Sequence, residues 1–581
     1  MKTVKIFALA LTVVTAGCTK ENFFPEFGFG EEQQTGEAQS SGVTGPTTLS
    51  FSADEEDNIA QTTFVRTIEI TFSESGDASV KGDENGTVTV KGNQVTVDNT
   101  TTKEKVKYQL SGTTSNGFFK IYSNNKQAIV LNGVSITNPS GAAINNQGKK
   151  RCFVVVNGDN YLADGASYTA TPDGEDEKAA FFSEGQLLFS GSGSLSVTAK
   201  GKAGITSDDY LHFMASPTIK VVSSAGHAIR GKDAVIVTDG TLSVKASADM
   251  KKGIASDSLV VFNGGVTTVA VTGGTAYDEE DKEYKAAAGV KADQLFVISG
   301  GSLTVTSSGT GAKGISGDGP AYFQGGTVDV TVTGSNYGKS SNNGPGGWGG
   351  GSSSSDNSKS AKGIKFDGNI YISDGSVSAK ASNHEAIESK GTIEITGGTV
   401  YAQSKDDAIN SAGMMAVTGG LVCAYSTGND GMDANGNLFI EGGVVYAVGS
   451  GSPEVALDAN TEQRYTLYIN GGTLFALGGL ESGAVLSQAC YSASSWNKNK
   501  WYSVTVGDNT YAFLTPGSGG SGLVVSGSSQ PEVKSNVSVS GGTQIFNGMG
   551  VVDGTVSGGS TVSLSKYSGG NSGPGAGWPG H

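Results

Sequence analysis

The sequence predicts an all-β protein whose main part is a right-handed parallel β-helix, a solenoid with roughly 22–25 residues per coil. Three observations support this fold class. Short runs that alternate apolar and polar residues stand between Gly, Asn and Asp, as in "GTVTVKGNQVTV". No convincing helical period is present. An anchor, a small residue followed by an aliphatic one, recurs with a strand, a Gly-Gly corner and a second strand, and the anchors Ile387, Ile409 and Met432 lie 22 and 23 residues apart.

Composition supports a repeat array and excludes other classes. The chain has 581 residues, 89 of them Gly, and only 16% are charged. Gly shows no Gly-X-Y period, which excludes collagen. The Leu and Asn template of leucine-rich repeats is absent, and propeller blades need about 40 residues per repeat. The net charge of −16 argues against nucleic acid as a partner.

The N-terminus predicts a secreted lipoprotein. "MKTVKIFALALTVVTAGCTK" has two Lys, an apolar run and small residues before Cys18. Residues 1–17 are therefore expected to be a signal peptide, and the ending resembles a bacterial lipobox, which implies lipidation of Cys18. The alternative is a plain signal peptide. We expect a monomeric, surface-exposed outer-membrane lipoprotein that contacts the membrane through its lipid alone.

The remaining elements follow in order along the chain. The polar, Gly-rich residues 18–45 predict a flexible tether, and residues 46–116 predict an N-terminal β cap or first coils. Residues 117–499 carry the repeat, interrupted by insertions at 277–285 and 338–361. Residues 500–566 are rich in strands but break the repeat, so they predict a C-terminal β region. The tail, 567–581, is expected to be disordered.

Acidic residues recur beside the anchors of three successive coils. In a parallel solenoid, equivalent positions stack one strand spacing apart, so like charges there repel unless they are protonated or bridged by a cation. Clustered Asp, Glu and Asn oxygens select Ca²⁺. His384 could add a ligand, although a lone His in a polar turn is more often merely exposed. The predicted Ca²⁺ ligands are Glu385, Asp407 and Asp430 (two before the anchor), Glu388, Asn410, Asp433 and Asp458 (one after it), and the neighbouring Asp406 and Asn429.

A metal-free alternative stays open, because solenoid corners also stack Asp and Asn for turn geometry alone. In that case the acids form a solvated ladder. A second column, three residues after the anchors, is too long and regular to be one site and is interpreted as structural: Asp208, Asp257, Asp293, Asp318, Asp367, Asn435 and Asn460.

Several stretches together resemble a known family. "AIVLNGVSITNPSGAAI", "KAAFFSEGQLLFSGSGSLSV" and "GHAIRGKDAVIVTDGTLSVKAS" look like the bacterial carbohydrate-binding-domain family with a pectate-lyase-like β-helix, over most of residues 100–490. The resemblance implies Ca²⁺ at Asp-rich coil edges and binding of acidic plant polysaccharide such as polygalacturonate. It also implies relatedness to polysaccharide lyases. Lys252, Lys313 and Lys362 stand where acids are expected, which puts Ca²⁺ in doubt in the earlier coils.

Binding and cleavage are separate hypotheses. A pectate lyase needs Ca²⁺ on the uronate carboxylate and a basic residue near the C5 proton. The candidate bases are Lys365, Lys390 and Lys405, but surface Lys is common on solenoids, so a binder is favoured over a lyase. An adhesin or structural rod without a soluble glycan ligand is a third possibility.

Neutral glycans would use aromatic platforms instead of a metal. Tyr401, Tyr446 and Phe475 are predicted to point outward in a stripe that could stack on sugar rings. The equally weighted alternative is that these rings pack beneath the C-terminal region.

Overall fold

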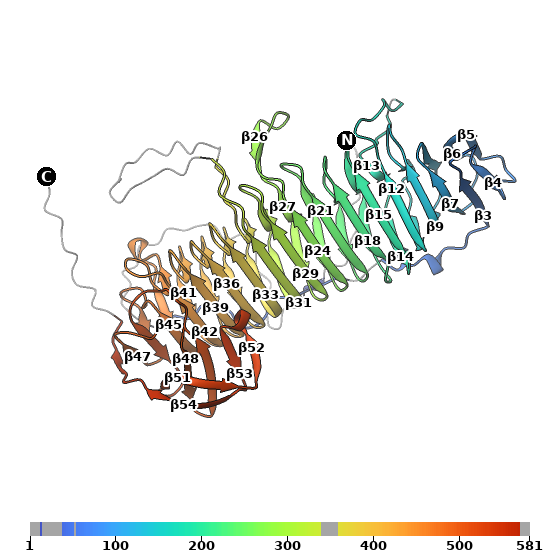
Figure 1. The fold of residues 1–581 in the computed structure, drawn as a ribbon. Coiled ribbons are helices and arrows are strands. Elements are labelled where there is room, and N and C mark those ends of the chain that lie inside the picture. Colours follow the sequence, from blue (N-terminus) through green and yellow to red (C-terminus); the bar gives the residue numbers. More distant parts are fainter. Residues whose placement is uncertain (1–11, 14–37, 52–53, 173, 339–357, 570–581) are drawn as a thin grey trace. The chain divides into compact units, whose positions relative to one another are not determined.

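The computed structural model describes residues 12–13, 38–51, 54–172, 174–338 and 358–569 (Figure 1). These residues confirm the predicted all-β parallel solenoid, with about 15 turns. Most of the signal peptide, Cys18, most of the tether, most of the 338–361 insertion and nearly all of the tail lie outside the described residues. The helices of the described ranges are single 3-10 turns: η1 (Glu55–Asp57), η2 (Ile59–Gln61), η3 (Thr461–Gln463) and η4 (Phe546–Gly548). None of the described helices has the length and apolar character that crossing a bilayer requires.

The chain forms two compact units. Unit 1 is built mainly from Phe51–Pro320 and Gly326–Lys365, and unit 2 from Leu11–Ser50, Ala321–Gly325 and Phe366–His581. The boundaries fall within or beside two strands, β31 (Ala321–Val332) and β32 (Ile364–Phe366).

Unit 1 stacks its strands into three series, one from each side of the coil. The anchor series contains β5 (Val88–Lys91), β6 (Asn93–Asn99), β8 (Gly117–Ser123), β10 (Ile144–Asn146), β13 (Ala179–Ser183), β16 (Ala203–Ser207), β19 (Ile229–Gly231), β22 (Lys252–Ser256), β27 (Ala288–Ala292) and β30 (Lys313–Gly317). The second contains β4 (Ser79–Lys81), β3 (Arg66–Phe72), β7 (Val106–Thr114), β9 (Gln127–Thr137), β11 (Cys152–Asn157), β14 (Leu187–Gly191), β17 (Tyr210–Phe213), β20 (Ala234–Val237), β23 (Leu259–Phe262) and β28 (Leu295–Ile298). The third contains β12 (Asp159–Ala163), β15 (Ser194–Ala199), β18 (Thr218–Ser223), β21 (Thr241–Ala246), β24 (Val266–Val271) and β29 (Ser302–Ser307).

Antiparallel pairs close the N-terminal end of unit 1. β4 pairs antiparallel with β3, and β5 pairs antiparallel with β6, whereas the later strands of these series pair in parallel. An antiparallel pair at this end covers hydrogen-bonding groups that the first parallel strand would otherwise expose. This agrees with the expected N-terminal cap. The insertion at 277–285 forms a hairpin of its own, β25 (Ala276–Asp278) and β26 (Glu283–Lys285).

Unit 2 contains shorter coils and the C-terminal β region. Its anchor series contains β34 (Ile387–Ser389), β37 (Ile409–Ser411), β40 (Met432–Ala434) and β43 (Leu457–Ala459). The other two series contain β33 (Ile370–Ala381), β35 (Ile393–Ile395), β38 (Met415–Val417), β41 (Leu438–Ile440), β44 (Leu467–Ile469) and β46 (Val485–Leu486), and then β36 (Thr399–Ser404), β39 (Leu421–Ser426), β42 (Val444–Val448) and β45 (Thr473–Leu477). Three further strands pair antiparallel beside β45, namely β50 (Leu523–Ser526), β47 (Cys490–Ala493) and β55 (Ser565–Tyr567). A six-stranded sheet follows the order β52 (Thr543–Ile545), β53 (Gly550–Val552), β49 (Asn509–Leu514), β48 (Trp501–Val506), β51 (Glu532–Ser540) and β54 (Thr555–Thr561).

The predicted register of unit 2 is confirmed. Ile387 pairs with Ile409, Ile409 with Met432, and Met432 with Leu457, and all four side chains are buried. The corners also follow the prediction, because the second Gly of each pair, such as Gly420 with φ of 80°, has the positive φ that Gly adopts without strain.

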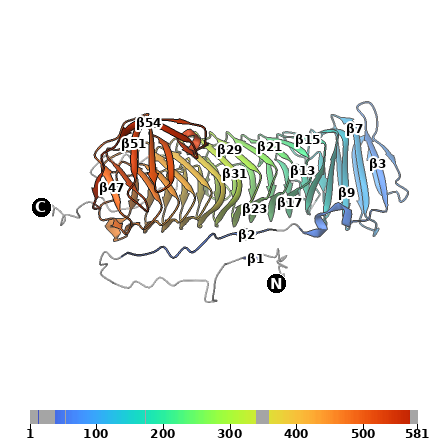
Figure 2. The same cartoon turned by 90° about the horizontal axis from the view of Figure 1, so that it is seen from below.

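Part of the expected tether lies against unit 2. Residues 38–50 run along its outer surface (Figure 2), where the N–H of Ser41 donates to Glu441 (2.9 Å) and Val43 packs beside the stacked rings of Phe439 and Tyr468. Residues 38–45 are therefore held by these contacts, contrary to the expectation of a free tether. Within this segment, β2 (Leu49–Ser50) pairs antiparallel with β1 (Thr12–Val13).

Candidate functional site: an acidic ladder in unit 2

The predicted acidic residues lie on four adjacent coils of unit 2. Strand pairing places Glu388 beside Asn410, Asn410 beside Asp433, and Asp433 beside Asp458. These residues stack because each follows a buried anchor by one position, and anchors in successive coils are in register. We call the set of Glu385, Glu388, Asp406, Asp407, Asn410, Asn429, Asp430, Asp433 and Asp458 the acidic ladder.

A second column runs through the residues two before the anchors. The N–H of Asp430 donates to Asp407 Oδ1 (3.1 Å), and the N–H of Val455 donates to Asp430 Oδ1 (2.5 Å). Each carboxylate therefore accepts from the equivalent position of the next coil. Asn410 connects the two columns, since its Nδ2 donates to Asp407 Oδ2 (3.2 Å) and to Asp433 Oδ2 (2.6 Å).

The column two residues before the anchors is buried, which argues against the solvated alternative. Glu385, Asp407 and Asp430 are only 7%, 6% and 6% exposed. Burial, together with the negative charges of Asp433, Asp406 and Asp430, raises the pKa of Asp407 to about 8. A carboxylate in this position needs either a proton or a cation at neutral pH.

The neighbouring acids are shifted in the same direction. Burial and the adjacent Glu454 raise the pKa of Asp430 to about 8. Burial and a hydrogen bond with Glu481 raise the pKa of Asp458 to about 9, while burial raises that of Asp433 to about 6 despite the hydrogen bond from Asn410. The ladder therefore holds several carboxyl groups that destabilise one another when ionised.

The closest convergence of possible ligand atoms is at one corner of the ladder. His384 Nδ1, Glu385 and Asp406 each offer an atom within 4.8 Å of the others. His384 contacts both acids, with 3.0 Å between Nδ1 and Asp406 Oδ2. Asn429 donates to the other oxygen of Asp406 (2.9 Å). His384 is thus part of the cluster and is not simply an exposed turn residue.

Two acids beside the ladder were missed from sequence. Glu454 and Glu481 interact with Asp430 and Asp458 respectively. Glu454 stands three residues before the anchor Leu457, the position that His384, Asp406 and Asn429 occupy in their own coils. The repeat period could have found it. Glu481 does not stand at a position that recurs in the other coils, so the repeat period could not have predicted it.

The donor set fits Ca²⁺ by its chemistry. Carboxylate and amide oxygens from stacked coils are the hard ligands that Ca²⁺ takes, in numbers of six to eight. Among the described residues, Lys390 forms an ion pair with the buried Glu388, and His384 contacts Glu385 and Asp406. The remaining acids of the two columns would bind the ion.

The candidate bases are placed less favourably. Burial opposes the charged form of Lys390, but the hydrogen bond and charge of Glu388 outweigh this and raise its pKa. Lys390 is therefore protonated at neutral pH and is a poor general base. Lys405 is exposed, and Lys365 lies half-buried in unit 1.

Of the two alternatives for the aromatic residues, packing beneath the C-terminal region is confirmed and the outward sugar-stacking platform is wrong. Tyr401, Tyr446 and Phe475 are buried in a cluster with residues of the C-terminal region, including Phe513. The Tyr446 hydroxyl donates to the carbonyl oxygen of Leu514 (2.9 Å). These rings pack inside unit 2 because the six-stranded sheet covers them, so they cannot stack on a sugar.

Comparisons with known proteins give the family. The structure of the polysaccharide lyase-like protein from C. thermocellum, a gadolinium derivative, is similar at 18% identity over 46% of this chain and 92% of that chain, with a TM-score of 0.32. Comparison with curated proteins found no match. The family model described as "carbohydrate-binding domain-containing protein" matches residues 91–252, 247–336 and 310–408, which together span more than half of the 581 residues. The chain therefore belongs to the family of carbohydrate-binding domain-containing proteins.

Proposed function

We propose that the protein binds acidic polysaccharide of the polygalacturonate type through Ca²⁺ held by the acidic ladder. The family supports carbohydrate as the ligand class. The observation that carries the Ca²⁺ part is the buried column of Asp407 and Asp430, whose carboxyl groups have pKa values of about 8 where no cation is present.

At the acidic ladder, the negative charge of the protein favours an acidic ligand only when a metal ion lies between them. A protein of net charge −16 repels a polyuronate. A Ca²⁺ ion with protein ligands on one side keeps coordination positions for the carboxylates of the polysaccharide. The ion therefore removes the repulsion within the ladder and supplies the attraction for the ligand.

Cleavage is the less supported function. A lyase needs a basic group that accepts the C5 proton, and the candidate that contacts Glu388 of the ladder, Lys390, is held in its charged form by that contact. We therefore propose a binder, with a lyase or an adhesin as outcomes that the test below would reveal.

The test is calorimetric titration of the protein with polygalacturonate in Ca²⁺ and again in a chelator. Binding that requires Ca²⁺, and that is lost in an Asp407→Asn, Asp430→Asn variant, supports the proposal. Asp508→Asn is the matched control, because Asp508 is exposed at the turn between β48 and β49. Absence of binding in both buffers rejects the polyuronate hypothesis, and release of unsaturated uronides would indicate a lyase.

We further propose that the protein is a surface lipoprotein anchored at Cys18. Only the sequence motivates this, through the lipobox-like ending at residues 16–18. Fractionation of cells that express the wild type and Cys18→Ala tests it. The proposal requires that the wild type partitions with membranes and that the variant does not.

A further inference from the structure

Unit 1 contains a pocket lined by basic residues. Its volume is about 320 Å³, at the lower end of the range for small-molecule sites. The polar lining consists of Lys178, Lys202, Thr206, His227, Arg230 and Lys251. The other lining residues are Gly and Ala, so none of the lining residues in this described part of unit 1 carries a carboxylate.

The solenoid register brings these residues together. β16, β19 and β22 are neighbours in the anchor series, with Ile205 paired to Ile229 and Thr206 paired to Arg230. His227 precedes its anchor by two residues and Arg230 follows it by one. These are the positions that carry acids in the ladder of unit 2, so the same coil geometry presents nitrogen donors here, namely the imidazole of His227 and the cationic guanidinium of Arg230.

Several hydrogen-bond donors of the pocket remain available to a ligand. Arg230 uses one terminal nitrogen for Asp257 (2.6 Å), which leaves other N–H groups of its guanidinium. The ammonium group of Lys178 forms ion pairs with Asp176 and Asp208. The described residues include no ion-pair partner for Lys251.

The half-buried His227 and the buried Thr206 add neutral donors. His227 Nδ1 accepts the backbone N–H of Lys252 (2.9 Å), so the proton of the neutral ring is on Nε2. Burial and the nearby Lys252 hold the pKa of His227 well below its usual value, which keeps the ring neutral. Thr206 is 2% exposed, and its hydroxyl has no hydrogen-bond partner among the described residues. An unsatisfied buried hydroxyl is costly, and a ligand that accepts from it removes the cost.

We propose that this pocket binds the carboxylate of a uronic acid unit directly, as a calcium-independent subsite for acidic glycan. Arg230 and Lys251 supply the charge, and His227 and Thr206 supply neutral donors. Guanidinium and carboxylate groups match in geometry, which favours a carboxylate over a neutral sugar hydroxyl. The glycan class rests on the proposed function, but the site needs neither the acidic ladder nor Ca²⁺.

The test is titration of the full-length protein with trigalacturonate in EDTA at low ionic strength. We expect binding that Arg230→Gln and Lys251→Gln each weaken at least about tenfold, since each removes a charged hydrogen-bond donor. Arg230→Lys should retain part of the affinity. Lys220→Gln is the matched control, because Lys220 is exposed on β18, outside the pocket. Thermal melting checks that each variant is folded.

The outcomes separate this site from the ladder. Binding in EDTA that persists in the Asp407→Asn, Asp430→Asn variant supports the pocket even if Ca²⁺-dependent binding fails. Absence of trigalacturonate binding in EDTA overturns the proposal and leaves the ladder untouched. Equal affinity of Arg230→Gln, Lys251→Gln and Lys220→Gln also overturns it. Displacement by inorganic sulfate but not by free galacturonate rejects the carboxylate assignment.

Discussion

Equivalent positions of the coil carry acids in unit 2 and nitrogen-containing side chains, neutral His227 and basic Lys252, in unit 1. Two residues before the anchors, unit 2 has Glu385, Asp407 and Asp430, whereas unit 1 has His227 and Lys252 in adjacent coils. The same strand pairing stacks both sets. A solenoid thus fixes where side chains gather, and the residue type at the position decides which ligand chemistry the surface offers.

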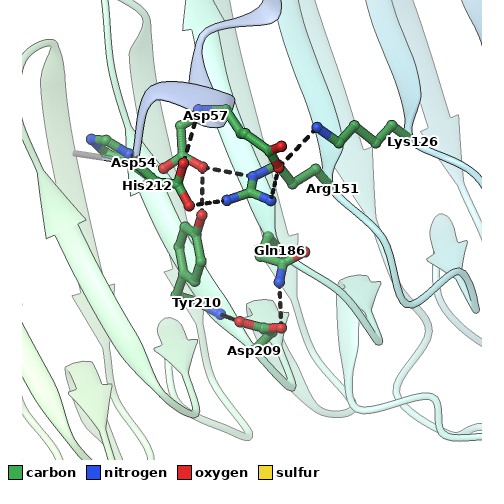
Figure 3. A network of polar contacts seen from close by, with 9 residues as sticks. Asp54, Asp57, Lys126, Arg151, Gln186, Asp209, Tyr210 and His212 are labelled. Carbon is green, nitrogen blue, oxygen red and sulfur yellow. Dashed lines mark hydrogen bonds and ion pairs between the residues drawn. The ribbon is translucent and has the colours of Figure 1, made fainter. Parts of the chain in front are cut away.

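Buried acids are also treated differently in the two units. In unit 1, Asp57 is 2% exposed but lies among donors (Figure 3), with Arg151 Nε at 3.0 Å and His212 Nδ1 at 2.9 Å, and Tyr210 also donating. Burial opposes its ionisation, yet the hydrogen bonds from His212, Tyr210 and Arg151 outweigh this and lower the pKa of Asp57. Asp407 is buried to a similar degree, and its pKa is raised. Asp57 already has the guanidinium of Arg151, whereas Asp407 needs either a proton or a cation at neutral pH.

The largest expected effect is loss of Ca²⁺ binding in the Asp407→Asn, Asp430→Asn variant. Two charged ligands are removed, so affinity should fall at least ~100-fold. The apo protein at pH 8 should become more stable, because the amides keep an acceptor for the backbone N–H groups and remove the repulsion. Calorimetry and thermal melting in EDTA measure the two effects. A variant less stable than wild type in EDTA would contradict a site that requires a cation.

Asp57→Asn should have the opposite effect on stability. It breaks a buried ion pair with Arg151 and leaves that guanidinium without its innermost partner. The expected cost is about 2–3 kcal/mol of unfolding free energy, independent of Ca²⁺. Denaturant unfolding with and without Ca²⁺ checks it. If Asp57→Asn and Asp407→Asn changed apo stability in the same direction, the comparison between the two carboxylates would fail.

The pH dependence of apo stability follows from the ladder. The pKa of Asp407 is about 8 in the folded state against an ordinary value of 3.8 for an Asp side chain, and the pKa of Asp430 is shifted in the same way. Between these values the folded state holds more protons than the unfolded state, so stability falls as pH rises from about 4 to about 8. Saturating Ca²⁺ should remove most of this slope. Melting curves in EDTA at pH 5 and pH 8 test the sign, and a higher melting temperature at pH 8 would refute it.

The repeat period of the sequence was sufficient to predict the fold and the residues that make up the ladder. Anchors at Ile387, Ile409 and Met432 fix the register, and the register fixes which acids stack. The repeat period does not predict which side chains are buried by segments distant in the sequence. Tyr446 looked outward from its own strand, but residues from the C-terminal sheet cover it. Asp57 pairs with Arg151 and His212, about 94 and 155 residues away, through a 3-10 turn that no repeat predicts.

The smallest expected effect concerns the aromatic cluster, and it sharpens the distinction between packing and ligand binding in unit 2. Tyr446→Phe removes only the hydroxyl that donates to Leu514, at a site that is fully buried. One buried hydrogen bond is worth about 1 kcal/mol, and the orphaned carbonyl adds to the cost. Stability should fall by about 1–2 kcal/mol in denaturant unfolding, while polygalacturonate affinity stays unchanged. Phe475 stacks on Phe513 in the same cluster, so the ring contacts survive the substitution. A fall in glycan affinity without a change in stability would show that the aromatic stripe takes part in glycan binding. The expected result instead leaves the ladder and the basic pocket as the two ligand-binding surfaces.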